Sequence, residues 1–139
     1  MRFAGSLADR KPSRYARDAE KHAADLMSKF AEITGRTADA KKYAKRFEEI
    51  KKSFQNRYVT KDGLIVNSTQ TSYLLGLHFN LLADNHRATA INEIVSDVAK
   101  RNGHLSTGFV GASYLNPELT LGGRTDIAYQ LMAQTSWPS

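Results

Sequence analysis

Apolar residues recur at helical spacing through the first 58 residues. Residues 15–33 and residues 37–58 each carry them at positions i, i+3 or i+4, and i+7, with polar residues between. The first stripe consists of Tyr15, Ala19, Ala23, Leu26, Met27, Phe30 and Ile33. Gly35 stands between the two stretches and suits the end of a helix. The pattern predicts two amphipathic helices joined by a tight turn.

The next two stretches differ in their apolar coverage. Residues 71–82 are apolar nearly all round, which predicts a helix that is buried on most sides. Residues 84–100 are apolar on one face only, and Asp84 or Asn85 is expected to cap the helix that they form.

Two further helices complete the predicted set, a short one near residues 113–119 and a last one from about residue 124 to residue 134. Residues 60–63 form a turn signal before a short extended piece. The fold class is therefore all-α, with about six helices in consecutive hairpins. A two-layered helical ring and a simple bundle of hairpins both fit this pattern.

Composition narrows the class of protein. The chain has 139 residues, which suits one domain, and it contains no cysteine, which excludes disulfides and a thiol nucleophile. The chain contains no run of about 18 apolar residues, so no membrane span is predicted. The first 12 residues lack the apolar core of a secretory signal, so a cytoplasmic location is expected.

Positive charge is concentrated in the first 58 residues, which hold 15 basic and 8 acidic side chains. The basic residues of the second predicted helix lie opposite its apolar side and are not interleaved with stacking aromatic residues. This arrangement favours a solvated helix face over a nucleic-acid partner.

Candidate catalytic groups are few. Most acidic residues beyond residue 58 have a structural explanation as turn, cap or helix-surface residues, and only Glu118, which follows a proline, is unassigned. The four histidines show no metal-ligand spacing, so neither a metal nor a cofactor is expected.

The stretch from His104 to Leu115 mixes glycine, hydroxyl and aromatic side chains. Such a loop suits a carbohydrate pocket, because aromatic faces pack on sugar C–H groups while hydroxyls and imidazole bond sugar hydroxyls. A connecting loop that uses glycine for tight turns explains the same composition, and composition alone favours that reading.

Five motifs occur in a characteristic order: Asp62-Gly63-Leu64-Ile65, Ser68 to Leu77, Gly103 to Gly111, Gly123 to Leu131, and Trp137-Pro138-Ser139. Over about residues 25–139 they resemble the catalytic domain of bacterial α-L-rhamnosidases (glycoside hydrolase family seventy-eight). The resemblance divides the chain into an unassigned segment, residues 1–20, and a helical domain, residues 21–139.

The resemblance implies an (α/α)6 barrel of six helical hairpins. It also implies hydrolysis of terminal α-L-rhamnosides with inversion, by one Glu acting as general acid and another as general base. It places five substrate-binding candidates toward the funnel of the ring: Thr69, Gln70, His104, Thr107 and Phe109.

The chain also departs from the family pattern. Nothing like the family's general-acid segment occurs in residues 1–60, and its general-base segment is expected beyond residue 139. Ser68 stands where the family usually has Asp. The expectation is about half of the barrel without either catalytic carboxylate.

Three hypotheses follow. The first is a partial rhamnosidase domain with weak or no independent activity, completed by self-association as a dimer, because residues 71–82 are too apolar for so short a chain to surround. The second is a non-enzymatic helical protein that binds carbohydrate or acts as a scaffold. The third is a repurposed hydrolase that uses Glu118 across a subunit interface.

Overall fold

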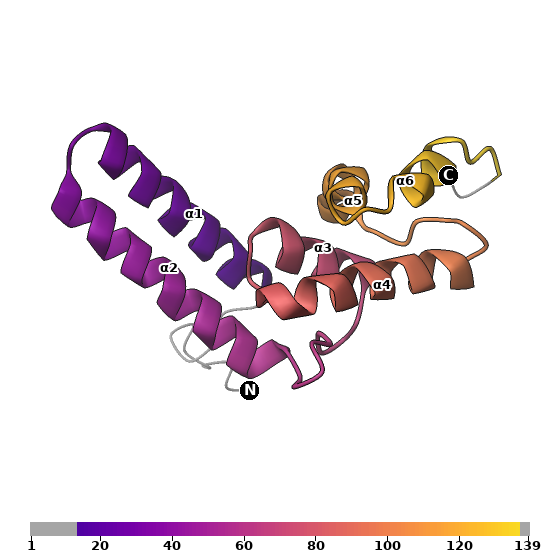
Figure 1. Cartoon of the computed structure of the whole chain (residues 1–139), viewed down its shortest axis with the longest axis horizontal. Helices are drawn as coiled ribbons and strands as arrows, with labels where there is room; N and C mark the ends of the chain where they lie inside the picture. Colours follow the sequence, from indigo (N-terminus) through magenta and orange to yellow (C-terminus); the bar gives the residue numbers. More distant parts are fainter. Residues whose placement is uncertain (1–13, 137–139) are drawn as a thin grey trace, which may run out of the picture. The chain divides into compact units, whose positions relative to one another are not determined.

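A computed structural model describes residues 14–136, with side chains from residue 20 onward (Figure 1). Its helices are α1 (Arg14–Ile33), α2 (Thr37–Tyr58), α3 (Gln70–His78), α4 (Asp84–Lys100), α5 (Phe109–Leu121) and α6 (Thr125–Met132). The described residues form no strand beyond an isolated bridge between Val59 and Ile65. The all-α prediction of consecutive helical hairpins is confirmed.

The chain forms two compact units, Met1–Ile50 and Lys51–Ser139, which are described separately. The motif at residues 137–139 lies outside the described residues, as do residues 1–13 of the predicted N-terminal segment. Within residues 14–136 no helix is long and apolar enough to cross a membrane.

In the first unit, α1 and α2 form a hairpin that turns at Gly35, whose φ of +71° favours glycine. The buried face of α1 consists of Lys21 and of three small residues, Ala24, Ser28 and Ala31. The Ser28 hydroxyl donates a hydrogen bond of 3.1 Å to the Ala40 carbonyl of α2. Small side chains thus let the two helices approach closely.

The larger apolar residues of α1 face solvent. Leu26, Met27, Phe30 and Ile33, which we call the α1 apolar face, are 37, 44, 58 and 82% exposed. An apolar stripe normally faces a core, but here the small-residue face of the same helix packs instead. The sequence predicted the helix correctly, but the side of α1 that carries the large apolar residues is not the side that is buried.

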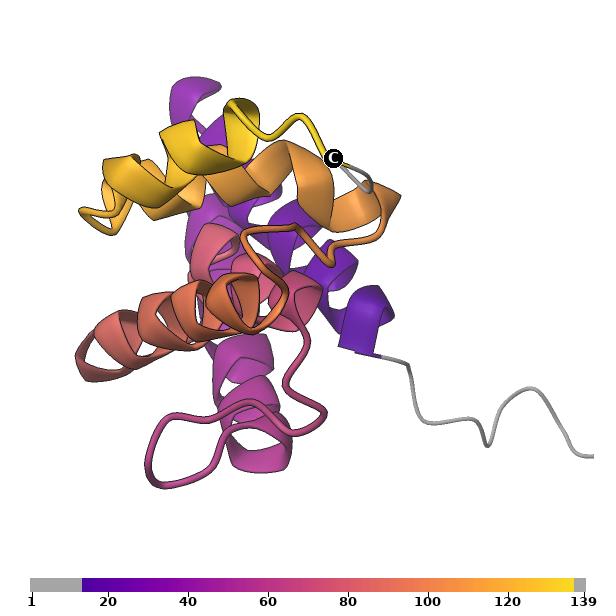
Figure 2. The same cartoon turned by 90° about the vertical axis from the view of Figure 1, so that its right-hand side faces the viewer.

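The core of the second unit is built around α3, in which every residue from Gln70 to Leu77 is buried. Helices α4 and α5 both pack on α3, and α6 packs on α5, beside which it lies in Figures 1 and 2. Phe54 and Ile65 join the same apolar cluster. The expectation that this chain is too short to surround the apolar helix is therefore wrong.

Several helix ends differ from the sequence predictions, and α5, predicted near residues 113–119, runs from Phe109 to Leu121. Helix α3 ends at His78 instead of residue 82, because Asn80 adopts a φ of +50° and the Leu81 N–H turns back to the Gly76 carbonyl at 2.9 Å. Helix α4 begins without a side-chain cap at Ala83. The expected cap is therefore wrong, and Asp84 lies in the first turn, where a carboxylate is favoured by the helix dipole.

Candidate functional site

The loop of residues 101–108 joins α4 to α5 and carries two of the five predicted binding residues, His104 and Thr107, and Phe109 follows it as the first residue of α5 (Figure 2). Asn102 and Gly103 reverse the chain with φ values of 55° and 82°. The Gly103 N–H donates to the Val98 carbonyl at 2.9 Å and so closes α4. The start of α3 and the end of α4 meet at this loop through side-chain hydrogen bonds.

One carboxylate oxygen organises those hydrogen bonds. Asp97 Oδ2 accepts from Gln70 Nε2 at 2.7 Å, from Ser106 Oγ at 2.8 Å and from Arg101 Nε at 2.9 Å. Gln70 Oε1 in turn accepts from the Ser106 backbone N–H at 2.8 Å. Burial alone would raise the pKa of Asp97, but the hydrogen bonds from Arg101, Ser106 and Gln70 bring that pKa below its ordinary value of 3.8.

The other side of the loop contacts the segment that follows α6. Gln134 Nε2 donates to the Gly103 carbonyl at 3.4 Å, and Ser136 Oγ lies 3.3 Å from His104 Nε2. The loop is therefore held between the α3–α4 pair and residues 134–136.

The structure separates the five predicted binding residues into two groups. Thr69 caps α3 by accepting the Ser72 N–H, and Gln70, only 1% exposed, has both ends of its amide bonded within the protein. His104 and Thr107 lie in the loop, and Phe109, which is 98% exposed, begins α5 directly after it. The buried atoms His104 Nδ1 and Thr107 Oγ1 find no hydrogen-bond partner among the described residues.

Glu118, the catalytic candidate, lies at a different place. It is 4% exposed on α5, with Oε1 3.0 Å from His78 Nδ1 and Oε2 3.8 Å from Arg87. The His78 ring stacks on Tyr114 with centroids 4.2 Å apart. Nine residues of helix separate Glu118 from Phe109, a rise of about 13 Å. The structure therefore does not bring Glu118 together with the loop.

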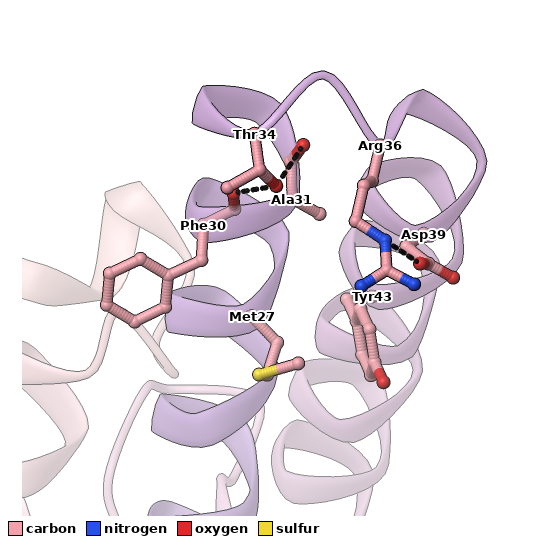
Figure 3. A pocket seen from close by; sticks show the side chains of 7 residues that line it. All are labelled: Met27, Phe30, Ala31, Thr34, Arg36, Asp39 and Tyr43. Atoms are coloured by element: carbon pink, nitrogen blue, oxygen red, sulfur yellow. Dashed lines mark hydrogen bonds and ion pairs between the residues drawn. The ribbon is translucent and has the colours of Figure 1, made fainter.

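A pocket of about 410 Å³ opens in the hairpin of the first unit (Figure 3). Met27 of α1 lies opposite Tyr43 of α2 across it, and Phe30 also lines it although its ring points away from Tyr43. An ion pair of 3.1 Å joins Arg36 to Asp39 at its edge. The spacing of residues in the sequence did not predict this pocket. Across residues 14–136, no group of three or more His, Cys, Asp or Glu side chains could hold a metal ion.

Residues 17–139 match the family described as the bacterial alpha-L-rhamnosidase 6 hairpin glycosidase domain. An alpha-L-rhamnosidase of Streptomyces avermitilis is 42% identical over 118 residues, and one of Formosa agariphila is 33% identical over 120 residues. Each alignment covers 85% of this chain but only 11% and 13% of the relative. The predicted resemblance is confirmed, with a match that begins at residue 17 rather than near residue 25.

Solved structures give the same result. The α-L-rhamnosidase of Streptomyces avermitilis complexed with L-rhamnose is similar with a TM-score of 0.85 and 40% identity, covering 89% of this chain and 12% of that protein. The native enzyme of Aspergillus terreus has a TM-score of 0.85 and 25% identity, covering 94% of this chain and 16% of that protein. This chain thus spans about an eighth of the length of its relatives.

Proposed function

Because the chain belongs to the family of bacterial α-L-rhamnosidase six-hairpin glycosidase domains, we propose that it supplies the sugar-binding loop of a domain acting on terminal α-L-rhamnosides. The observation that carries this proposal is the likeness of the chain to a Streptomyces avermitilis enzyme complexed with L-rhamnose. The proposed binding residues are His104, Thr107 and Phe109.

The chemistry of these three residues suits a sugar ring. The exposed Phe109 ring offers an apolar face on which the C–H side of a sugar can pack. Nε2 of the His104 imidazole, which lies near the exposed Ser136 hydroxyl, can exchange a hydrogen bond with a sugar hydroxyl. The Thr107 hydroxyl is buried without a hydrogen-bond partner among the described residues, so it bonds a sugar hydroxyl only when the loop moves to expose it. The bond from the Ser106 backbone to Gln70 fixes the chain between His104 and Thr107.

We also propose that residues 1–139 alone have weak or no turnover. Inverting hydrolysis needs two carboxylates that flank the scissile bond and a water molecule. The carboxylate that contacts the loop, Asp97, already accepts three hydrogen bonds, and Glu118 is ion-paired at a different place. These placements favour a chain that binds sugar without hydrolysing it.

Two assays on the 139-residue protein test this function. Binding of L-rhamnose is measured by NMR titration, and turnover is measured with an aryl α-L-rhamnoside. Binding with little or no turnover supports the proposal. Efficient turnover would contradict the proposed weak activity, and the absence of binding would contradict the sugar-binding role.

For a partner, we propose a second copy of the chain seated on the α1 apolar face. Exposed apolar patches favour association, and Met27 and Phe30 of this face also line the pocket of Figure 3. Residues 20–36 carry three acidic and three basic side chains, so two copies of this face approach without net repulsion. Residues 37–58, with seven basic and three acidic side chains, would repel a second copy.

Light scattering at micromolar concentration tests this partner. The wild-type protein is expected to be a dimer, and Phe30→Asp is expected to shift it toward monomer. Asn56→Asp is the matched control, since it adds the same charge on the exposed surface of α2. A stable wild-type monomer would overturn the proposal.

A further inference from the structure

We propose that Asp97 and Gln70 are positioning residues that hold residues 104–108 of the loop between α4 and α5 in one conformation. Neither residue is among the proposed sugar contacts, and they act through Ser106. The inference rests on the proposed function for the identity of the ligand, L-rhamnose, whereas the conformation of the loop is tested independently of it.

The loop has few main-chain contacts of its own. Within residues 14–136, the only backbone N–H of residues 105–108 that donates a hydrogen bond is that of Ser106, and its acceptor is Gln70 Oε1. The same residue donates its hydroxyl to Asp97 Oδ2 at 2.8 Å. Ser106 is therefore held twice, once by its backbone and once by its side chain.

The accepting oxygen of Asp97 decides which way the Gln70 amide faces. A carboxylate only accepts hydrogen bonds, so it selects the amide NH2 group of Gln70, which lies 2.7 Å from Oδ2. This choice leaves Oε1 directed at the Ser106 N–H. If the Gln70 amide were reversed, its oxygen would face the Asp97 carboxylate and its NH2 group would face the Ser106 N–H. Neither of these contacts could form a hydrogen bond.

Because Gln70 is buried, loss of its hydrogen bonds to Asp97 and Ser106 would destabilise this part of the protein. Gln70 is 1% exposed, so an amide that loses its partners could not turn to water instead. Arg101 Nε, 2.9 Å from the same carboxylate oxygen, supplies a compensating positive charge. The network thus connects the first residue of α3 and the last turns of α4 to the loop that carries His104 and Thr107.

The test compares Asp97→Ala with Asp97→Asn in the full 139-residue chain. All three donors reach one oxygen of Asp97, so an Asn side chain can present its amide oxygen in the same position and retain the hydrogen bonds. Glu93→Ala is the matched control, because Glu93 lies one turn earlier on α4, and among the described residues no hydrogen bond or ion pair joins it to the loop.

Amide hydrogen exchange of Ser106 is the first measurement. Asp97→Ala is expected to speed that exchange by about tenfold, since the loop can then open locally. The buried Leu119 amide of α5 should keep its protection. Asp97→Asn should restore most of the Ser106 protection, and Glu93→Ala should leave it unchanged. Ser106→Ala, which removes only the hydroxyl hydrogen bond, is expected to give an intermediate rate even if Asp97→Ala does not fold.

Affinity for L-rhamnose is the second measurement. It is expected to fall about tenfold in Asp97→Ala, with recovery in Asp97→Asn, a pattern that a merely structural role would not give. Unchanged Ser106 exchange in both Asp97→Ala and Ser106→Ala would overturn the proposal. Faster exchange with unchanged affinity would overturn the positioning of the sugar site. If the wild-type protein binds no L-rhamnose, the proposed function fails, and hydrogen exchange alone decides whether Asp97 holds the loop.

Discussion

Replacing Glu118 with Gln separates a structural role from a catalytic one. The side chain is 4% exposed, and its carboxylate lies 3.0 Å from His78 Nδ1 and 3.8 Å from Arg87. A hydrogen bond to a charged group contributes about 1.5–3 kcal/mol, against about 1 kcal/mol for a neutral one. His78 and Arg87 are each more than a third exposed, so water compensates part of the loss.

We therefore expect Glu118→Gln to lower the free energy of unfolding by about 1–2 kcal/mol. In a chain of this size this change corresponds to a fall in melting temperature of about 5 °C. Thermal unfolding followed by circular dichroism measures the effect. Glu93→Gln, the same charge change at a partly exposed position on α4, should shift stability by less than about 0.5 kcal/mol.

The same variant is assayed with an aryl α-L-rhamnoside. Any residual turnover should change only with the folded fraction, because Glu118 lies away from the loop. Abolished turnover in a Glu118→Gln protein that melts like the wild type would refute this reasoning and favour the hydrolase that uses Glu118.

Four further predictions follow from the structure. Phe109→Ala should leave the melting temperature within about 2 °C, because the ring is 98% exposed, and should weaken L-rhamnose binding in an NMR titration. The lowered pKa of Asp97 stabilises the fold above its ordinary value of 3.8, and this effect is lost as pH falls through the folded value. The stability advantage of the wild type over Asp97→Asn in urea unfolding should therefore be full at pH 7 and shrink below about pH 4. Gly122→Ala should cost about 1–3 kcal/mol in the same assay, because the added Cβ would lie 2.5 Å from Ile91 Cδ1. Phe30→Asp should reduce the mass measured by light scattering without lowering helicity, since the ring is 58% exposed.

Each of these predictions has a contrary result. A large fall in melting temperature for Phe109→Ala would mean that the ring is packed. A stability difference for Asp97→Asn that is independent of pH would show that the charge of Asp97 does not stabilise the fold. A Gly122→Ala protein as stable as the wild type would show that Ile91 relaxes without cost, and an unchanged mass for Phe30→Asp would remove the α1 apolar face from the interface.

Local sequence signals predicted the helices well. Gly35 and Gly103 mark helix ends because their positive φ values favour glycine, and an apolar period of about 3.6 residues is the main sequence signal of a helix. The buried face of α1 was not predictable in this way. It depends on the fit of Ala24 and Ser28 against α2, which no property of α1 alone reveals.

The candidate site was predictable only in part. The motif around His104 indicated the loop, because glycine, hydroxyl and aromatic residues occur together there. The role of Gln70 was not visible, since its partners Asp97 and Ser106 lie 27 and 36 positions along the chain. The only nearby sequence feature that points to a role for Asp97 is its spacing of four residues from Arg101. Such a pair of opposite charges is common on solvated helices and does not indicate a site.

Sugar binding at the loop between α4 and α5 is the central proposal for this protein. Backbone amide shifts of the 139-residue protein, followed during titration with L-rhamnose, test this binding residue by residue. We expect shifts concentrated at His104, Thr107 and Phe109, with residues 27–43 unaffected. Shifts confined to residues 27–43, or no shifts at millimolar sugar, would contradict the assignment of the loop as the sugar-binding site.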